Sequence, residues 1–203
     1  PSHHVLVNRD PGSYTSTAAW LARDGSLEVH AAEGGLERAG SLRYASYAVH
    51  DTGGGTLHLQ FNHLTPVVLA TALELAGPGA MFRVPALVAA IGLLLVYAAA
   101  VRATRRPWAS LLAPALLGVS MPFLYVARDT FSEPVTMALL WGAVLTGAVV
   151  ATRDREDAGS PTPRVGAAAV AGLLLGASVA TRIDSLLLVA VAVVLCAGFV
   201  AAE

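Results

Sequence analysis

The sequence predicts an all-α fold: a polytopic transmembrane helical bundle of about five spans, preceded by an extracytoplasmic loop segment. The first observation is composition, because 55% of the 203 residues are hydrophobic and only 13% are charged, whereas charged residues make up about a quarter of an ordinary soluble domain. The second is a series of uncharged stretches, each 17 to 21 residues long. They are residues 84–101, 107–127, 134–152, 165–181 and 185–202.

Each of these stretches has the length of a membrane crossing, since a helix needs roughly 17–25 apolar residues to cross the hydrocarbon core. A helix of a soluble protein would carry polar residues every few positions along its exposed face, and these stretches do not. The formal net charge of −1 gives no general attraction to nucleic acid. The single cysteine, Cys196, excludes both a disulfide and a cysteine metal site within this chain.

The segment before the spans is predicted to be an extracytoplasmic first loop over residues 1–62, followed by an interfacial helix over residues 63–78. Residues 13–23 suit a short helix that starts after Pro11-Gly12, and a short strand is expected near residues 56–61. Residues 64–77 are apolar but too short to span, and they contain Glu74, which favours a helix at the membrane surface.

The arginines predict the orientation of the chain. Two alternate connections between spans carry three arginines each, and the opposite two carry one each, Arg128 and Arg182. The arginine-rich connections contain Arg102, Arg105 and Arg106 in one case and Arg153, Arg155 and Arg164 in the other. These loops are therefore expected in the cytoplasm and residues 1–62 outside. Since the chain begins with Pro1 and has no signal peptide, we expect it to be a piece of a longer protein with a span upstream.

The first candidate site is Asn8-Arg9-Asp10-Pro11-Gly12-Ser13-Tyr14. An aspartate before Pro-Gly is often only a turn residue whose carboxylate accepts hydrogen bonds from backbone amides. At the outer membrane surface, however, the Asp10 carboxylate is also suited to act as a general base toward an acceptor hydroxyl.

The second and third candidates are the two outer turns. The second candidate is the turn Arg128-Asp129-Thr130-Phe131-Ser132-Glu133-Pro134. It predicts either the start of a helix that Ser132 caps or an anion-binding site at Arg128. The third candidate is the turn Thr181-Arg182-Ile183-Asp184. It predicts either an ion pair within a tight turn or a second arginine at the same membrane surface as Arg128.

The remaining patterns are weaker. His58 and His63 lie five residues apart without nearby cysteine or carboxylate, so no metal ligand is predicted and His63 is expected to make a polar contact at the membrane surface. Gly172 and Gly176 predict close helix packing. The sequence has no phosphate loop, dinucleotide fingerprint or nucleophile elbow.

Taken in order, these motifs resemble the GT-C glycosyltransferases, and most closely the protein mannosyltransferase and lipid A aminoarabinose transferase branch, known as glycosyltransferase family 39. The residues that carry the resemblance are Arg9-Asp10-Pro11-Gly12-x-Tyr14, His63-Leu64-Thr65-Pro66, Phe82-Arg83-Val84-Pro85, Arg128-Asp129-x-x-Ser132-Glu133-Pro134 and Gly176 with Arg182. The likeness covers the whole chain. One departure is that several relatives have a second acidic residue after the first-loop aspartate, where this sequence has Pro11.

The resemblance implies a multi-pass enzyme of the cell membrane, with its active site on the extracytoplasmic face, that moves a sugar from a polyprenyl-phosphate donor to an acceptor hydroxyl with inversion. The acceptor would be a lipid, a glycan or a protein. Asp10 would be the base, and Arg128 and Arg182, with Arg83, would stabilise the phosphate leaving group. The resemblance also implies substrate-binding roles for Arg9, Tyr14, His63, Asp129 and Glu133. It leaves open whether a divalent metal ion assists, because some relatives use one and others do not.

Two other classes remain open at this point: a membrane transporter or permease fragment, and a non-catalytic membrane scaffold. A transporter is expected to have ionisable or helix-breaking residues near the middle of its spans. The five uncharged stretches contain no Asp, Glu, Lys, Arg or His. The helix-breaking residues Pro114 and Pro122 in the second stretch are the only feature that favours a transporter.

Overall fold

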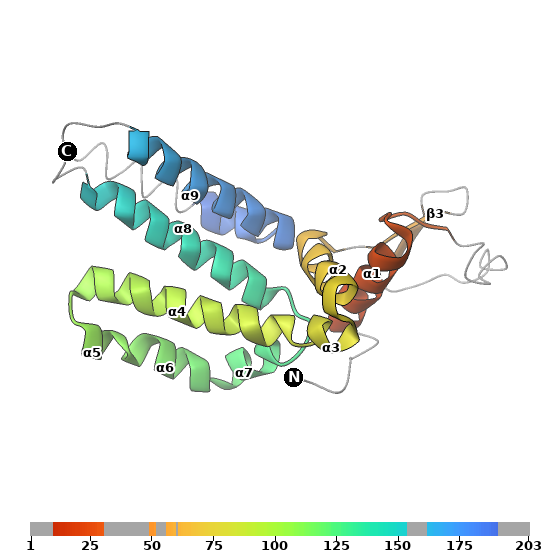
Figure 1. Ribbon diagram of the computed structural model, residues 1–203, viewed down its shortest axis with the longest axis horizontal. Helices are drawn as coiled ribbons and strands as arrows, with labels where there is room; N and C mark the ends of the chain where they lie inside the picture. Colours follow the sequence, from red (N-terminus) through yellow and green to blue (C-terminus); the bar gives the residue numbers. More distant parts are fainter. Residues whose placement is uncertain (1–9, 31–48, 52–55, 60, 154–161, 191–203) are drawn as a thin grey trace. The chain divides into compact units, whose positions relative to one another are not determined.

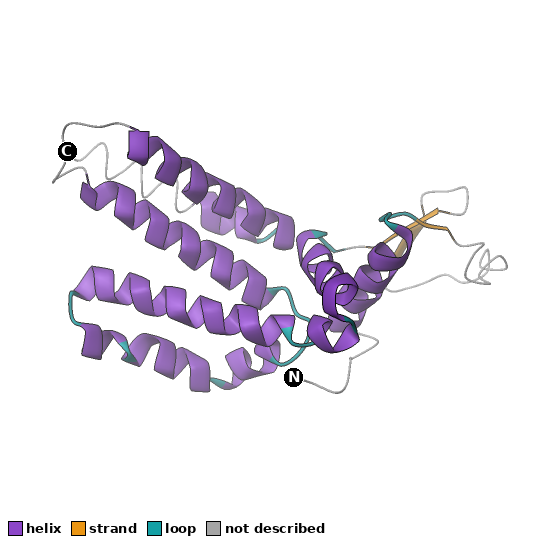
Figure 2. Ribbon diagram, viewed as in Figure 1, coloured by secondary structure: helices purple, strands orange, loops and turns teal. Residues whose placement is uncertain are grey.

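The computed structural model describes residues 10–30, 49–51, 56–59, 61–153 and 162–190, and these residues are mostly helical (Figures 1 and 2). The predicted helical class is therefore confirmed. The described residues also contain a small three-stranded sheet, of which the sequence predicted one strand. The chain divides into two compact units: residues 1–84 with 129–131, and residues 85–128 with 132–203. Each unit is described separately.

The first unit contains α1 (Asp10–Asp24), α2 (Leu64–Ala76) and the short α3 (Pro78–Met81). Its sheet consists of β1 (Val29–His30), β2 (Val49–Asp51) and β3 (Thr56–Leu59), with β3 in the middle and antiparallel to both neighbours. β2 and β3 pair with Val49 opposite Leu59. The sheet is small because its strands are only two to four residues long.

Helix α1 begins three residues before the predicted helix. Pro11 is tolerated in its first turn because the first amides of a helix have no partner within the helix. Tyr14, Ala18, Leu21 and Ala22 recur at helical spacing and form one apolar side of α1. This side packs against α2, where Leu69 and Ala70 are buried with Tyr14 and Ala18.

Helix α2 ends at Gly77, which has a φ of 79° and donates its amide to the carbonyl of Leu73 at 2.8 Å. That conformation is unfavourable for a residue with a side chain, so a glycine at this position stops the helix. The helix predicted over residues 63–78 corresponds to α2, and the short α3 follows it from Pro78.

The second unit contains most of α4 (Val84–Thr104), then α5 (Pro107–Ser110), α6 (Leu112–Val119), α7 (Met121–Ala127), α8 (Glu133–Arg153) and α9 (Thr162–Thr181). Residues 185–190 begin a further helix. Helices α8 and α9 lie side by side (Figure 1). The predicted stretch 185–202 is described only as far as residue 190.

Helices approach closely where glycine lacks a side chain. At Gly142 of α8, an added Cβ would lie 3.3 Å from the Leu174 side chain of α9. At Gly92 of α4, it would lie 2.1 Å from the terminal methyl of Met137 in α8. Nothing lies within 4 Å of such a Cβ at Gly172 or Gly176 among the described residues, so the contact predicted for this pair is not seen there.

The stretch 107–127, predicted as one span, is broken in the structure. Residues Pro107–Val119 and Met121–Ala127 are bent by 67° at Ser120, whose backbone is extended (ψ 137°) and whose hydroxyl donates to the carbonyl of Leu117 at 2.7 Å. Pro122 lies in the first turn of α7 and cannot donate to a continuing helix, which accounts for the break.

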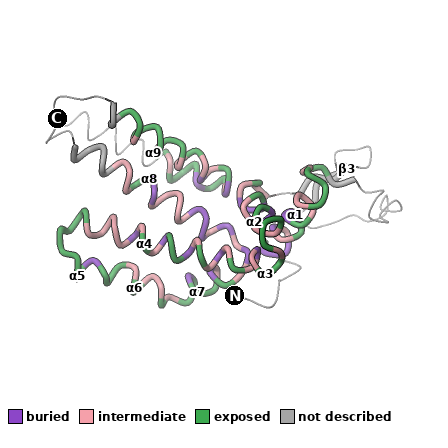
Figure 3. Tube along the Cα trace, viewed as in Figure 1, coloured by how far each residue is buried: buried purple, intermediate pink, exposed green. Residues whose placement is uncertain are grey.

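The described residues contain one helical stretch, Pro78–Thr104, that is long and apolar enough to cross a membrane, and two if the bent pair counts as one span. In Pro78–Thr104, 22% of the most apolar 18-residue window is buried. Exposed residues occur on the other helices of the second unit as well (Figure 3), and large apolar side chains are among them. They include Trp108, Leu112, Leu116, Val119, Met121, Leu173 and Leu187, while Leu87, Ile91 and Leu94 are exposed on α4 itself.

Candidate functional site

The first unit joins two of the predicted motifs directly. The Thr130 hydroxyl lies 2.9 Å from the carbonyl oxygen of Pro11 and 2.8 Å from the Thr15 hydroxyl. The Thr15 hydroxyl is itself 2.7 Å from the same carbonyl. Thr130 is fully buried. The first-loop motif and the turn at 129–131, far apart in the sequence, therefore share one buried hydrogen-bonded contact, which we call the Thr130 contact.

Pro11 and Thr130, two residues of the Thr130 contact, each follow an aspartate. Asp10 precedes Pro11, is exposed, and makes no ion pair or side-chain hydrogen bond with another described residue. Asp129 precedes Thr130 and accepts the Thr130 amide on Oδ1 at 2.8 Å. The Asp129 carboxylate thus shapes its own turn, whereas that of Asp10 is exposed to solvent.

The second unit joins two other predicted motifs. Arg182 donates from one terminal nitrogen to Oε1 of Glu133, and from the other to Oδ2 of Asp184 at 2.9 Å. Its Nε also donates to the Asp184 carboxylate at 3.1 Å. The predicted tight-turn ion pair is therefore present, and Glu133 holds Arg182 from the neighbouring helix.

The electrostatics of this trio differ from a simple phosphate site. Burial alone would lower the pKa of Arg182, but the hydrogen bond to Asp184 and the charges of Glu133 and Asp184 outweigh it and raise this pKa. The hydrogen bond from Arg182 lowers the pKa of Asp184. One guanidinium between two carboxylates carries a net charge of −1, so an anion would meet less attraction here than at a lone arginine.

A pocket of about 290 Å³ adjoins the trio. Glu133, Arg182, Asp184 and Ser185 line its polar side, and its apolar side chains come from α8 and the helix that starts at residue 185. These are Met137, Leu140, Trp141 and Leu188. The pocket is therefore amphipathic, with a size and lining that suit a small polar head attached to an apolar chain.

Beside the pocket, a chain of hydroxyl groups connects α8 and α9. The hydroxyls of Thr136 and Thr181 lie 2.6 Å apart, and Thr181 also donates to the carbonyl of Ser178 at 2.5 Å. Thr136 Oγ1 also lies 3.0 Å from the carbonyl oxygen of Ser132, and because a hydroxyl carries one proton, Thr136 donates either to this carbonyl or to Thr181. Since all four residues are buried, these hydrogen bonds hold the ends of the two helices that carry Glu133 and Arg182.

Tyr14, predicted as a substrate-binding residue, is buried. Its side chain is 4% exposed and lies in the core of the first unit, with its ring 5.1 Å from that of Phe61. Because the apolar side of α1 faces α2, Tyr14 is enclosed by packing instead of lining an open surface.

The other predicted residues are exposed or lie outside the described residues. His63 precedes the first turn of α2, is exposed, and makes no capping hydrogen bond through its side chain. Arg83 and Arg128 are exposed near helix ends. Arg9 lies outside the described residues. In the part of the chain that the structure describes, no three His, Cys, Asp or Glu side chains gather as a metal site would require.

Sequence reasoning missed Thr15, Thr130, Thr136 and Thr181. Threonine is common in loops and helices, and its local spacing says nothing about a partner more than 40 residues away. A usable signal was the position of Thr136 and Thr181 at the ends of apolar stretches, where a hydroxyl without a partner would be costly to bury.

The comparisons with known proteins are negative: no protein-family profile, no curated protein and no solved structure matches this chain.

Proposed function

We propose that this chain belongs to a multi-pass glycosyltransferase of the cell membrane with the GT-C plan, similar to glycosyltransferase family 39. The observation that carries the proposal is the Thr130 contact, because two motifs of the resemblance meet there. An enzyme of this kind would need its first outer loop and a later outer turn to meet. The described contact supports that requirement within one unit.

Apolar surface supports the membrane part of the proposal. The core helix of a soluble protein is mostly buried, whereas only 22% of the most apolar window of Pro78–Thr104 is buried. Large apolar side chains exposed on α6, such as Leu112 and Leu116, would be unfavourable in water. A bilayer around about five spans would cover these surfaces.

Asp10 acts as the base in the proposed reaction. Its carboxylate takes the proton of the acceptor hydroxyl while that oxygen forms a bond to the anomeric carbon of the sugar. The bond from that carbon to the phosphate oxygen breaks on the opposite face, which gives inversion, and the polyprenyl phosphate leaves with the electron pair. An exposed carboxylate with no described partner is free to accept this proton.

The candidates for stabilising the leaving phosphate in this proposal are Arg128 and Arg182, with Arg83 behind them. A guanidinium has five N–H donors, and one N–H on each terminal nitrogen of Arg182 remains beyond those used by Glu133 and Asp184. Glu133 and Asp184 hold the guanidinium group of Arg182 in a fixed orientation, so this group need not move during the reaction. The apolar wall of the adjoining pocket suits the start of a prenyl chain.

The test is the substitution Asp10→Asn, with Asp24→Asn as matched control. Both aspartates are exposed residues of α1, at opposite ends of the helix. In membranes that contain the complete protein, transfer from a radiolabelled polyprenyl-phosphate sugar should fall by a factor of about 100 or more in Asp10→Asn. It should be unchanged in Asp24→Asn. Full transfer by Asp10→Asn would overturn the role of Asp10.

One observation favours a transporter as the second candidate. The break at Ser120 divides an apolar stretch into two helices bent by 67°, and broken helices are a feature of transporter binding sites. Uptake or release of a solute by vesicles that contain the protein, without sugar transfer, would favour this alternative.

A further inference from the structure

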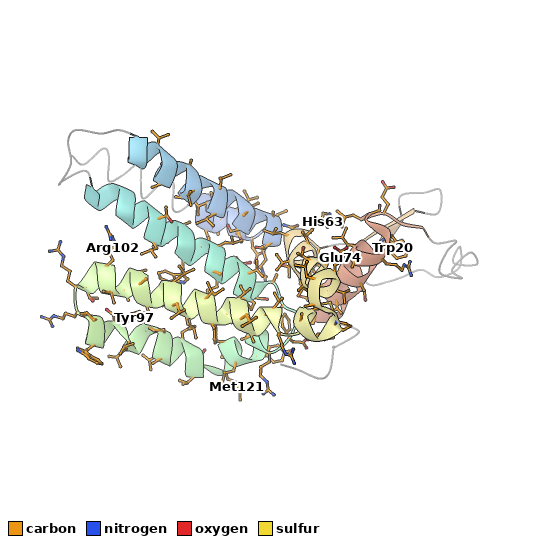
Figure 4. All side chains as sticks on the ribbon, viewed as in Figure 1. Trp20, His63, Glu74, Tyr97, Arg102 and Met121 are labelled. Atoms are coloured by element: carbon orange, nitrogen blue, oxygen red, sulfur yellow. The ribbon has the colours of Figure 1, made fainter. Side chains whose placement is uncertain are left out.

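The turn between α4 and α5 concentrates positive charge. Arg102, Arg105 and Arg106 are all exposed, and the chain has no acidic residue between Arg83 and Arg128. Arg102 is labelled in Figure 4 on the last turn of α4. Three guanidinium groups within five residues form a cationic surface, which we call the Arg105 turn.

The Arg105 turn has a defined shape. The Thr104 and Ser110 hydroxyls lie 2.8 Å apart, and the Arg106 amide donates to Thr104 at 3.2 Å. The Ser110 hydroxyl donates to the carbonyl of Arg106 at 2.9 Å. These hydrogen bonds close the turn, so the arginines project from an ordered piece of backbone.

Arg105 lies in the left-handed region of backbone conformation, with a φ of 57°. Among the described residues it is the one non-glycine with a positive φ. Glycine would take this conformation with far less strain. An arginine in a conformation that favours glycine points to a use for its side chain.

An aromatic side chain completes the surface. Trp108, two residues after Arg106, is 86% exposed. Its wide exposure is hard to explain in water, but tryptophan is enriched where a membrane meets water, because its ring is apolar while its N–H can be hydrated. Arginine and tryptophan side by side fit the boundary between head groups and acyl chains.

We propose that the Arg105 turn binds the head groups of anionic phospholipids and anchors this end of the second unit at the bilayer surface. This inference rests on the membrane part of the proposed function, but it needs neither sugar transfer nor Asp10. Charge complementarity selects the occupant: the phosphates of anionic lipids attract guanidinium groups, which can bind two phosphate oxygens at once. Phosphatidylglycerol serves as the anionic phospholipid in the test below.

The test uses the whole chain in phosphatidylcholine vesicles that contain either brominated phosphatidylglycerol or brominated phosphatidylcholine. Bromine quenches nearby tryptophan fluorescence, and a Trp108→Phe variant isolates the contribution of Trp108. We expect the brominated phosphatidylglycerol to quench Trp108 more strongly at equal concentration. This preference should weaken as salt is raised.

The variant Arg105→Gly tests the charge of Arg105 without disturbing the fold of the turn. Glycine favours the left-handed backbone, so the turn should keep its shape while one positive charge is lost. We expect the preference for phosphatidylglycerol to fall by up to about fivefold in this variant. It should vanish when Arg102, Arg105 and Arg106 are all replaced by Gln. Arg23→Gln, which removes an exposed arginine of α1, is the matched control and should change nothing.

The outcomes distinguish the two proposals. If the chain fails to float with phosphatidylcholine vesicles, the membrane part of the proposed function fails. If it floats but Trp108 shows no preference for phosphatidylglycerol, the lipid inference alone is overturned. If inorganic phosphate abolishes the preference when chloride of equal ionic strength does not, the turn is a site for free phosphate and the lipid inference is again overturned.

Discussion

The hydroxyl of Thr130 lies 2.9 Å from the carbonyl oxygen of Pro11, a residue 119 positions earlier in the chain. This contact fixes the backbone next to Asp10 against the backbone next to Asp129, while Thr15 reaches both partners from the next turn of α1. The position of the proposed base therefore depends on a hydroxyl far from it in sequence.

Replacing Thr130 by Val should destabilise the first unit by about 1 kcal/mol. The change keeps the shape of the side chain but removes its hydrogen bonds in a buried place. Chemical denaturation in detergent would measure the loss, and Thr130→Ser should restore most of it. Thr71→Val, at an exposed threonine of α2 that bonds only within its own helix, is the control. An equal loss in Thr71→Val would contradict the special role of the Thr130 contact.

Adding a side chain at Gly92 should disturb the packing of α4 against α8. A Cβ there would lie 2.1 Å from the end of Met137, so Gly92→Val should cost about 1–3 kcal/mol in unfolding free energy. Met137→Ala in the same chain should relieve part of this cost, since the clash is with that flexible side chain.

Gly176→Ala provides the contrast on α9. Nothing described lies within 4 Å of its added Cβ, and alanine is a better helix former than glycine by about 1 kcal/mol. The variant should be as stable as the parent or more so. A thermal unfolding temperature reduced as much as in Gly92→Val would show that Gly176 is packed after all.

The hydroxyl pair of Thr136 and Thr181 should couple α8 to α9. The oxygens lie 2.6 Å apart and both residues are buried. In a double-mutant cycle with Thr136→Val and Thr181→Val, we expect a coupling energy of about 0.6 kcal/mol if α8 and α9 lie in a bilayer as proposed. Additive losses, with no coupling, would mean that the hydroxyls act separately.

Asp184 should make stability depend on pH in the acid range. The hydrogen bond from Arg182 lowers the pKa of Asp184 in the folded chain, so the unfolded chain binds its proton more readily. The contribution of this ion pair is therefore present above about pH 4, the unfolded pKa of aspartate, and is lost as the pH falls through the folded pKa.

The measurement is the unfolding free energy of the parent and of Asp184→Asn between pH 6 and pH 2. The parent should be more stable at pH 6 by less than about 1 kcal/mol, because the Asp184 side chain is 66% exposed and water screens the pair. The two curves should converge at low pH. A difference that persists at pH 2 would mean that Asp184 acts through something other than its charge.

Composition and the spacing of charges were sufficient to predict a helical chain. Uncharged, apolar side chains offer the backbone amides and carbonyls no hydrogen-bond partners. In apolar surroundings, a continuous stretch can satisfy these groups within itself only by forming a helix. Hence α4, α8 and α9 fall on the predicted stretches to within a few residues. The break at Ser120 was hidden, because Pro114 and Pro122 are both compatible with a helix until the local hydrogen bonds are known.

For the candidate residues, too, the sequence indicated some features and only the tertiary structure showed the others. The chain alone indicated Glu133 and Arg182, because each stands at the end of a long uncharged stretch, and Asp10, because it precedes Pro11-Gly12 in the predicted first outer loop. It said nothing of which residues meet. Arg182 pairs with Glu133, Tyr14 is buried, and Thr130 contacts Pro11. Each of these contacts depends on the packing of segments that lie tens of residues apart in the sequence. Local sequence sets backbone preference and polarity, whereas partners over such distances are chosen by the packing of whole helices.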